Sequence, residues 1–233
     1  MRLHPWLRLF RAVNLPTVPG DVLVGAAAAA CAASAAALSP GRIALAVSGS
    51  CLLYMFGLAD NDIVGAAADR GRPIPDGELS MRAAKAARAV CLASGALALA
   101  ASGASAAAFA LIATTVAYNR LKNPALMGAC RGIDVTAGAS AAGMPFAWPA
   151  VVVAAVWTLY IAAVTKYSEG EEADPAKKRR VGLLVGGILW LQLAAACVFA
   201  AVSPRLWPVA AATAAMLAVH RTVARLMPQV SAS

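Results

Sequence analysis

The charged residues of this sequence are gathered into short clusters, and the stretches between the clusters are long and apolar. Hydrophobic residues make up 61% of the 233 positions, whereas charged residues make up only 13%. A soluble domain of this length needs about twice that share of charge on its surface. A helix needs about 20 residues, most of them apolar, to cross the hydrocarbon core of a bilayer. The pattern therefore predicts an all-α, polytopic membrane protein and argues against a soluble domain.

The apolar stretches predict about eight transmembrane helices in a single domain that covers residues 1–233. We place these helices at Val22–Leu38, Ile43–Ala59, Ala86–Ala101, Ala104–Ala117, Leu126–Gly143, Phe146–Thr165, Val181–Val202 and Leu206–Val223. Small residues recur within them, as in Ala26–Ala30. Because small side chains let membrane helices approach closely, these runs favour a tightly packed bundle.

The first 20 residues are basic and also contain bulky apolar side chains. Trp6 and Phe10 alternate with Arg8 and Arg11, which is typical of an amphipathic helix that lies at the membrane surface. The region superficially resembles a cleavable secretory signal, but the apolar stretch begins late, after Asp21. We therefore expect residues 1–20 to be a retained amphipathic segment.

The basic residues predict the orientation in the membrane. If the N-terminus is cytoplasmic, 18 of the 20 Lys and Arg residues fall on the cytoplasmic side, and only Arg42 and Arg205 face outward. An even number of crossings then places both termini in the cytoplasm. We expect an integral protein of the inner (cytoplasmic) membrane of a bacterium.

Composition also argues against two other kinds of site. The net charge of +9 could suggest a nucleic-acid partner, but nucleic acid needs a continuous basic face, and here the charge is divided among loops. We therefore expect no nucleic-acid partner. The five cysteines lie far apart, without the CxxC or CxxH spacing of a zinc site.

Acidic and basic side chains gather at the inner end of the second predicted helix, within Leu58–Ser80. The segment contains Asp60, Asn61, Asp62 and Asp69, followed by Arg70 and Arg72. Oxygen ligands of this kind bind Mg²⁺, and arginines bind phosphate with paired hydrogen bonds. A solvated acidic loop would have the same composition, so the segment alone leaves both interpretations open.

Arg131 and Asp134 are ionisable residues inside the fifth predicted helix. Their spacing of three places them on one face, where they can pair with each other. Ionisable groups at this depth face a cavity or a partner, because exposure to lipid is costly. The pair either fixes the register of the helices or forms part of a functional site.

An ordered set of motifs in the sequence resembles the UbiA family of intramembrane prenyltransferases. Asn61-Asp62, Asp69 and Arg72-Pro73-Ile74-Pro75 are similar to the family's first signature, NDxxDxxxD followed by RPIPSGxxS. The leader Leu7–Gly25 is similar to the family's entry into its first helix, and Tyr118 with Lys122 matches its YxxxK motif. Met127–Gly132 resembles the MGxCRG stretch of the EboC-like branch. These motifs occur in the expected order up to about Gly170.

The resemblance implies a helical bundle with a central cavity open to the cytoplasmic side. It also implies a prenyl diphosphate donor, a small-molecule acceptor, Mg²⁺ and surrounding membrane lipids. The implied metal ligands are Asn61, Asp62 and Asp69 on one side and Glu171 and Asp174 on the other. The implied diphosphate ligands are Arg72, Lys122 and Arg131, and the implied catalytic residues are Tyr118, Lys122, Arg131 and Asp134, with Asp134 orienting Arg131. The donor chain length, the acceptor and the oligomeric state stay open.

Two positions of the metal motifs differ from the family pattern. Gly65 stands where the first motif has its middle Asp, and Tyr167 stands where the second motif, DxxxD, has its first. The expected C-terminal end also lacks the family's ninth helix. A catalytically degenerate UbiA-like protein that binds or helps transport an isoprenoid or metabolite precursor is therefore the alternative to a prenyltransferase. An unrelated small transporter would need inverted repeats, and the sequence has no clear internal repeat.

Overall fold

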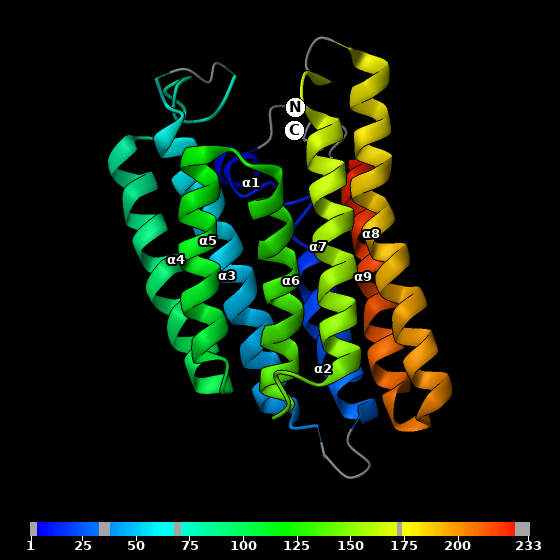
Figure 1. Ribbon diagram of the computed structural model, residues 1–233. Coiled ribbons are helices and arrows are strands. Elements are labelled where there is room, and N and C mark those ends of the chain that lie inside the picture. The colour runs from blue at the N-terminus through cyan, green and yellow to red at the C-terminus, as the bar shows by residue number, and fades with distance from the viewer. Residues whose placement is uncertain (1–3, 33–37, 68–70, 172–173, 227–233) are drawn as a thin grey trace.

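The computed structural model describes residues 4–32, 38–67, 71–171 and 174–226, and in these ranges the chain is a helical bundle without strands (Figure 1). The short helix α1 spans Pro5–Leu9. The long helices are α2 (Thr17–Ala32), α3 (Pro40–Val64), α4 (Met81–Ser102), α5 (Ser105–Leu121), α6 (Pro124–Ala141), α7 (Trp148–Ser168), α8 (Pro175–Val202) and α9 (Trp207–Leu226). A 3₁₀ turn, Pro204–Leu206, joins α8 to α9. The expected all-α bundle of about eight long helices is confirmed.

Local sequence sets where several helices begin. Asn123 precedes α6, and its side-chain oxygen accepts a hydrogen bond from the backbone amide of Ala125 at 2.9 Å. Pro124 follows at the first helical position, and Asp174 with Pro175 repeats this arrangement at the start of α8. An oxygen at the cap satisfies a free amide, and proline at the first position needs no hydrogen-bond acceptor.

Two helices extend beyond their predicted boundaries because polar side chains find buried partners. Helix α2 begins at Thr17, five residues before the predicted start, and so includes the fully buried Asp21. Helix α3 continues to Val64 and so includes Asp60 and Asp62, which are also buried. Hydropathy along the chain cannot register the hydrogen bonds from other helices that make such burial tolerable.

The outer surface of the bundle is apolar. By length and composition, α3, α4, α7 and α8 are each able to cross a membrane, and α2 is a shorter apolar helix. Large side chains on the outside are well exposed, including Leu97, Phe109, Leu159 and Val198. Hydrocarbon accommodates such a surface, whereas water does not. The protein is an integral membrane protein.

Helix α2 is the central element of the bundle. It packs against α3, α6, α7, α8 and α9, and Val18 and Val22 are fully buried. Gly25 lies against the backbone carbonyl of Val135, and Gly138 of α6 lies against the carbonyl of Val22. A Cβ atom at either glycine would collide with backbone. This close approach of α2 and α6 is typical of membrane helices with small residues.

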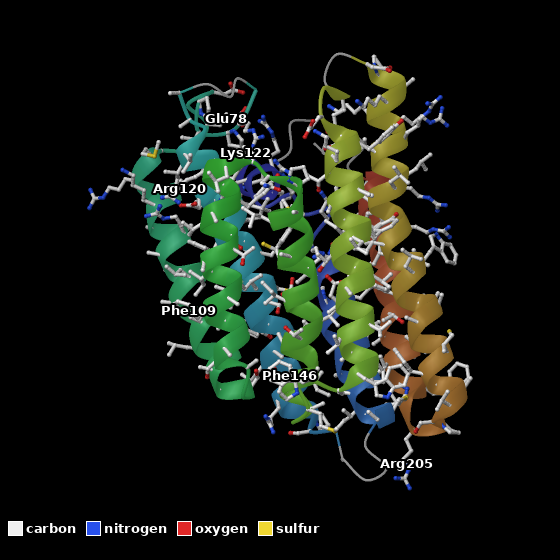
Figure 2. All side chains as sticks on the ribbon, viewed as in Figure 1. Glu78, Phe109, Arg120, Lys122, Phe146 and Arg205 are labelled. Atoms are coloured by element: carbon white, nitrogen blue, oxygen red, sulfur yellow. The ribbon has the colours of Figure 1, made fainter. Side chains whose placement is uncertain are left out.

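Charged side chains concentrate at one end of the bundle (Figure 2). Glu78, Arg120 and Lys122 lie at the upper end in this view, whereas Arg205 lies at the lower end. The connections α3–α4, α5–α6 and α7–α8 are at the upper end as well, and α2 begins towards it. We call this end the charged end. The up-and-down course of the helices therefore gathers most of the loop charge on one side, as the sequence predicted.

Helix α1 docks onto the segment between α3 and α4. Leu9 is buried against Ile74, and Arg8 donates a hydrogen bond to Glu78 at 2.5 Å. The amphipathic segment expected at the membrane surface thus packs on the protein at the charged end. The helix is short, and Arg11 just beyond it adopts a left-handed backbone conformation with φ of 41°.

Candidate functional site

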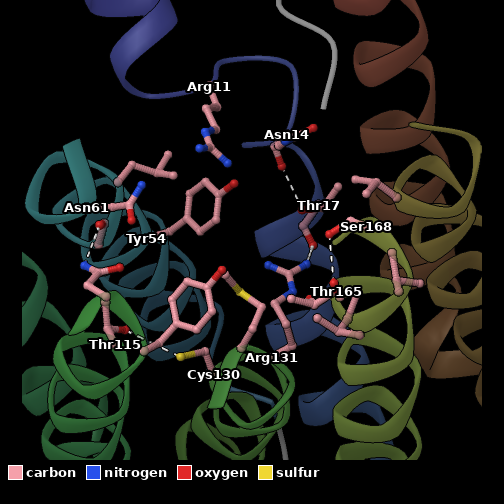
Figure 3. A pocket seen from close by; sticks show the side chains of 18 of the residues that line it. Arg11, Asn14, Thr17, Tyr54, Asn61, Thr115, Cys130, Arg131, Thr165 and Ser168 are labelled. Carbon is pink, nitrogen blue, oxygen red and sulfur yellow. Dashed lines mark hydrogen bonds between the residues drawn. The ribbon is translucent and has the colours of Figure 1, made fainter. Parts of the chain in front are cut away.

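A cavity of about 520 Å³ extends into the bundle from the charged end (Figure 3). Its walls come from α2, α3, α5, α6, α7 and α8, together with residues of the segments that follow α1 and α3. Apolar side chains that line it include Leu53, Leu111, Ile161, Val185 and Ile188. The cavity therefore joins a polar entrance region to an apolar interior.

The charged side chains that line the cavity are mostly cationic. Arg11, Arg72, Lys122 and Arg131 line it, whereas the carboxylates among its described lining residues are Asp134 and Glu171. A cleft with excess positive charge and low-dielectric walls attracts anions. The cavity therefore suits a ligand with an anionic group at one end and an apolar body.

Lys122 stands where α5 ends, and it connects three elements of the site. Its backbone is left-handed, with φ of 52°, and its Nζ lies 5.7 Å from the centroid of the Tyr118 ring. The same Nζ donates a hydrogen bond to the Asn61 side-chain oxygen on α3. The structure thus brings together Tyr118, Lys122 and Asn61, which the sequence singled out as separate motifs.

The carboxylates at the end of α3 are held by arginines. Arg72 donates to Asp62 Oδ1 at 2.5 Å, and Arg88 donates to Asp60 Oδ1 at 3.0 Å. Asn119 donates to the other Asp60 oxygen at 2.9 Å. Both carboxylates are buried and neither lines the cavity, although Arg72 does. Burial favours this pairing because an unpartnered charge away from water is costly.

The two acidic residues implied as metal ligands after α7, Glu171 and Asp174, lie in different surroundings. Glu171 is buried and lines the cavity. Asp174, which the resemblance implied as a metal ligand, is exposed and caps α8 instead. Its Oδ1 accepts from the amides of Ala176 and Lys177 at 2.9 and 3.2 Å. The proline at the start of α8 places Asp174 at the cap, outside the cavity lining.

The positions that depart from the family pattern also take structural roles. Gly65 is the C-terminal cap of α3, and its amide donates to the Asn61 carbonyl at 2.9 Å. Tyr167 lies on the exposed side of α7, where the Lys177 Nζ is 5.3 Å from its ring centroid. Asp69, the remaining implied metal ligand, lies outside the described residues.

The described residues do not form a magnesium site by themselves. In the ranges that the structure describes, no three His, Cys, Asp or Glu side chains form a group that could hold a metal ion. Asn61 and Glu171 place side-chain oxygens at the cavity, but Asn61 Oδ1 accepts from Lys122, and Asp60 and Asp62 are bonded to arginines. The side chains in these ranges therefore supply too few oxygen ligands to hold Mg²⁺ alone, and the ion would need phosphate or water oxygens to complete its near-octahedral shell.

Arg131 is held by a buried network that joins α2, α6, α7 and α8. Its Nε lies 2.8 Å from Asp21 Oδ2, and its Nη2 donates to the Thr17 carbonyl at 2.8 Å. Trp157 Nε1 donates to Asp21 Oδ1 at 2.7 Å, and Gln192 Nε2 donates to the same oxygen. The guanidinium is thereby fixed at the wall of the cavity.

The partner of Arg131 differs from the one that the spacing suggested. Asp134 was the expected partner because it lies three residues along the same helix, but the ion pair is formed with Asp21 of α2. Asp134 lines the cavity and is only 3% exposed. Its Oδ1 has no hydrogen-bond partner among the described residues. Helical spacing identifies neighbours on one helix and cannot weigh a carboxylate from another helix.

Several lining residues were not singled out from the sequence. These are Arg11, Asn14, Thr17, Tyr54 and Asn119. Tyr54 had a usable signal, because it precedes Asn61 by seven residues and so shares its helix face. Asp21 also had one, since an ionisable residue beside an apolar span indicates a partner or a cavity. No comparable signal marks Asn14.

Together, the bundle and the cavity define a polytopic membrane protein with a cationic site inside its helices. No protein-family model and no curated protein matches the sequence. Solved structures do share its fold. One is of digeranylgeranylglyceryl phosphate synthase, with a TM-score of 0.61 and 16% sequence identity, and the match covers 97% of this chain and 93% of that one.

Two further matches are structures of a UbiA homologue from Archaeoglobus fulgidus. The form bound to DMAPP and Mg²⁺ has a TM-score of 0.57 at 16% identity, over 92% of this chain and 86% of that one. The form bound to GPP and Mg²⁺ has a TM-score of 0.53 at 14% identity, over 96% and 87%. At these identities the comparisons show that the chain has the UbiA-like fold. The resemblance to the EboC-like branch stays a prediction.

Proposed function

We propose that the protein is a UbiA-like prenyltransferase that moves a prenyl group from a prenyl diphosphate to a small-molecule acceptor. The observation that carries this proposal is a cationic cavity, lined by Arg11, Arg72, Lys122 and Arg131, inside a bundle of the UbiA-like fold. The solved neighbours bound to DMAPP and GPP lend support, because both ligands join an apolar chain to a diphosphate.

The diphosphate is assigned to the entrance of the cavity. Lys122 and Arg72 lie there with Asn61, on segments that begin or end at the charged end. Charge-assisted hydrogen bonds from such groups hold phosphate oxygens, and they gain strength as negative charge develops on the leaving group. Arg11, from the segment after α1, adds a further cation above the cavity (Figure 3).

The prenyl chain is assigned to the apolar interior. Leu53, Leu111 and Ile188 line this part of the cavity, and they exclude water from a reactive allyl group. The rings of Tyr118 and Tyr54 also line the cavity, and Tyr54 is seen in Figure 3. An aromatic face beside the allyl carbon stabilises developing positive charge there. In the transfer, the bond between C1 and oxygen breaks and its electron pair leaves with diphosphate. The acceptor bonds to C1 and releases a proton to solvent.

Magnesium enters the proposal through the neighbours, which bind it together with their diphosphate ligands. We propose that Mg²⁺ accompanies the donor into the cavity, where Asn61 and Glu171 offer oxygen atoms. No step is assigned to the ion, because Asp60 and Asp62 are bonded to arginines. Metal-ligand roles for Asp69 and Asp174 are implied by the family resemblance alone.

The orientation and the cellular location are also proposals. The charged end faces the cytoplasm if the positive-inside rule holds, and the diphosphate then enters from that side. Both termini would lie in the cytoplasm, and the single domain would reside in the inner membrane of a bacterium, as a member of the EboC-like branch.

The experiment is a donor-consumption assay. Purified full-length protein is incubated with labelled geranylgeranyl or farnesyl diphosphate, Mg²⁺ and a panel of acceptors, and diphosphate release is measured. The expected result is acceptor-dependent release that a Lys122→Met variant reduces strongly. The Lys166→Met variant is the matched control, because Lys166 is at the same end but exposed and outside the cavity lining.

A second function is favoured by the positions that lack a carboxylate. Gly65 caps α3 and Tyr167 is exposed, so neither supplies a metal ligand at the cavity. The alternative is therefore a degenerate UbiA-like protein that binds or helps transport an isoprenoid or metabolite precursor. Saturable binding of labelled prenyl diphosphate without consumption, across all acceptors and with Mg²⁺ present, would select this alternative over the enzyme.

A further inference from the structure

Two arginines stand on the outer surface of α9, where their surroundings are apolar. Arg221 and Arg225 lie one turn apart, and both are exposed. Arg221 is fourteen residues beyond Trp207, the first residue of α9, and therefore about 21 Å from the end of the bundle opposite the charged end. Because the hydrocarbon core is about 30 Å thick, Arg221 lies on the surface that the membrane covers, towards the charged end. A charge at such a position is costly without a partner.

The described part of the protein supplies no carboxylate for these two arginines. Every ion pair within the described ranges is formed by other residues. Of the carboxylates close to the start of α8, Glu169 pairs with Lys166, and Asp174 caps the helix. Arg221 and Arg225 can therefore bind an anion that comes from the membrane beside them.

Arg221 is held in place by an aromatic side chain of α8. The centre of its guanidinium lies 4.9 Å from the ring centroid of Trp190, which is half-exposed. The preceding residue, His220, contacts the Val13 carbonyl oxygen through Nδ1 at 2.8 Å. This contact fixes the rotation of α9, so that Arg221 points outwards. A guanidinium stacked on a ring keeps its N–H edge free to bind an anion.

The neighbouring surface of α8 adds a third cation and apolar side chains. Arg179 precedes Trp190 by eleven residues, which is close to three full turns, so both lie on one face of α8. Arg179 is exposed at the charged end, and the exposed Leu183 lies between the two. Helices α8 and α9 run side by side (Figure 1). We call the surface formed by Arg179, Trp190, Arg221 and Arg225 the basic face.

The chemistry of the basic face matches an anionic phospholipid. Arginines bind phosphate oxygens with paired hydrogen bonds, and the exposed apolar side chains further along α8, such as Leu191 and Val198, suit acyl chains. Free phosphate has no group for this apolar surface. A zwitterionic lipid would bring its ammonium group close to three arginines, and like charges repel. The ligand class is therefore a phospholipid with a net negative headgroup.

We propose that the basic face binds one anionic phospholipid through its headgroup phosphate. Arg221, stacked on Trp190, donates to the phosphate oxygens, and Arg225 and Arg179 supply further positive charge on the side of the charged end. The acyl chains lie against α8 and α9, outside the bundle. None of these four residues lines the cavity, so the site is separate from the proposed prenyl-transfer site and does not depend on it.

The test compares two phospholipids with the same acyl chains and different headgroups. Full-length protein in a neutral detergent is freed of lipid and titrated with phosphatidylglycerol or phosphatidylcholine, and native mass spectrometry measures the affinity for the first bound lipid. The wild type is expected to bind phosphatidylglycerol about tenfold or more tightly than phosphatidylcholine. Arg221→Leu is expected to reduce this preference to about twofold, and leucine suits a surface that faces lipid.

Further variants separate the site from the general charge of this end. Arg82→Leu is the matched control, because Arg82 is exposed at the start of α4 at the same end, and its replacement should leave the preference unchanged. Trp190→Leu should weaken phosphatidylglycerol binding by about two- to fivefold, since the guanidinium loses its stacking partner. Arg221→Lys keeps the charge without the planar fork, so its affinity should fall between the wild type and Arg221→Leu.

Tryptophan fluorescence locates the lipid, because bromine on an acyl chain quenches a nearby indole. The part of the quenching that Trp190→Phe abolishes reports on Trp190 alone. In nanodiscs, this part should be larger when the brominated lipid is a minor share of phosphatidylglycerol in phosphatidylcholine than when the two lipids are exchanged. Arg221→Leu should remove the difference.

Three results would overturn the inference. The first is equal wild-type affinity for the two phospholipids, and this comparison needs no variant to fold. The second is a preference that Arg221→Leu retains, or that Arg82→Leu reduces as much, because the lipid would then bind elsewhere or respond only to general charge. The third is displacement of the first phosphatidylglycerol by inorganic phosphate, which would show that the arginines take a free anion and not a lipid.

Discussion

Arg131 of α6 and Asp21 of α2 form a buried ion pair, with Nε 2.8 Å from Oδ2. Asp21 is fully buried, and Trp157 and Gln192 donate to its other oxygen. The pair links the central helix to the wall of the cavity. It therefore sets the position of a cation that the proposed mechanism uses, although Asp21 itself is absent from the cavity lining.

Replacing Asp21 by Ala should destabilise the protein strongly. The change leaves the Arg131 guanidinium buried without its carboxylate, and breaking a buried pair in this way costs about 3–5 kcal/mol. Thermal stability in detergent, measured by the loss of the monodisperse peak after heating, reports the effect. The double variant Asp21→Leu with Arg131→Met should recover part of the loss, because it removes the buried guanidinium together with its partner. A double variant as unstable as Asp21→Ala would show that the pair is not the cause.

Replacing Lys122 by Met should weaken the binding of a prenyl diphosphate by about 10-fold or more, since a charged hydrogen bond contributes about 1.5–3 kcal/mol. Equilibrium binding of labelled geranylgeranyl diphosphate measures this change. Lys122→Arg should retain much of the affinity, because it keeps the charge. If Lys166→Met, the control at the exposed end of α7, weakens binding as much, then the loss reflects the general charge of this end and not the site.

The hydrogen bond between Arg72 and Asp62 should affect the Mg²⁺ concentration that the protein requires. Arg72 now occupies an oxygen that the first acidic motif would offer to a metal ion. Arg72→Gln should therefore lower the Mg²⁺ concentration needed for half-maximal diphosphate release, while it raises the KM for the donor. The two shifts have opposite directions, and a general loss of folding would not produce the first of them. Titration of Mg²⁺ at saturating donor gives the readout, and an unchanged or raised requirement would contradict the prediction.

The fold could be predicted from the sequence because hydropathy accumulates along each helix. Every long helix from α2 to α9 coincides with an apolar stretch, and caps such as Asn123 mark where some of them begin. The start of α2 could not be predicted in the same way. Thr17 and Asp21 are polar, and the groups that satisfy them belong to α6, α7 and α8, far away in the sequence.

Only some of the residues that line the candidate site were singled out from the sequence. Lys122 and Asn61 were expected on one side of the membrane, and they meet in a hydrogen bond. The ion-pair partners could not be predicted from the sequence, because they depend on how each helix is rotated about its axis. Asp60 pairs with Arg88, for example, although no spacing rule connects a residue of α3 with one of α4.

Gly138→Ala should destabilise the bundle at its centre. A Cβ atom at this position would collide with the Val22 carbonyl, and backbone cannot move aside as a flexible side chain does. Overpacking of this kind costs about 1–3 kcal/mol. Gly41→Ala is the matched control, because no atom lies within 4 Å of the added Cβ. Equal thermal stability of the two variants in detergent would contradict the close approach of α2 and α6.

The orientation of the charged end can be tested with single cysteines. The native cysteines, Cys31, Cys51, Cys91, Cys130 and Cys197, are first replaced by alanine. Arg179→Cys then places an exposed thiol near the charged end, on the first turns of α8, and Arg205→Cys places one at the opposite end. Because basic loops stay in the cytoplasm, a membrane-impermeant maleimide added to intact cells should label only the Arg205→Cys variant.

The Arg179→Cys variant should react once the cells are opened, which controls for the accessibility of its thiol. Labelling of this variant in intact cells, with protection of the Arg205→Cys variant, would reverse the orientation. The cavity entrance would then face away from the cytoplasm. Diphosphate groups made in the cytoplasm could not reach Lys122 and Arg72 from the charged end, so the orientation decides whether the cationic entrance can serve a cytoplasmic donor.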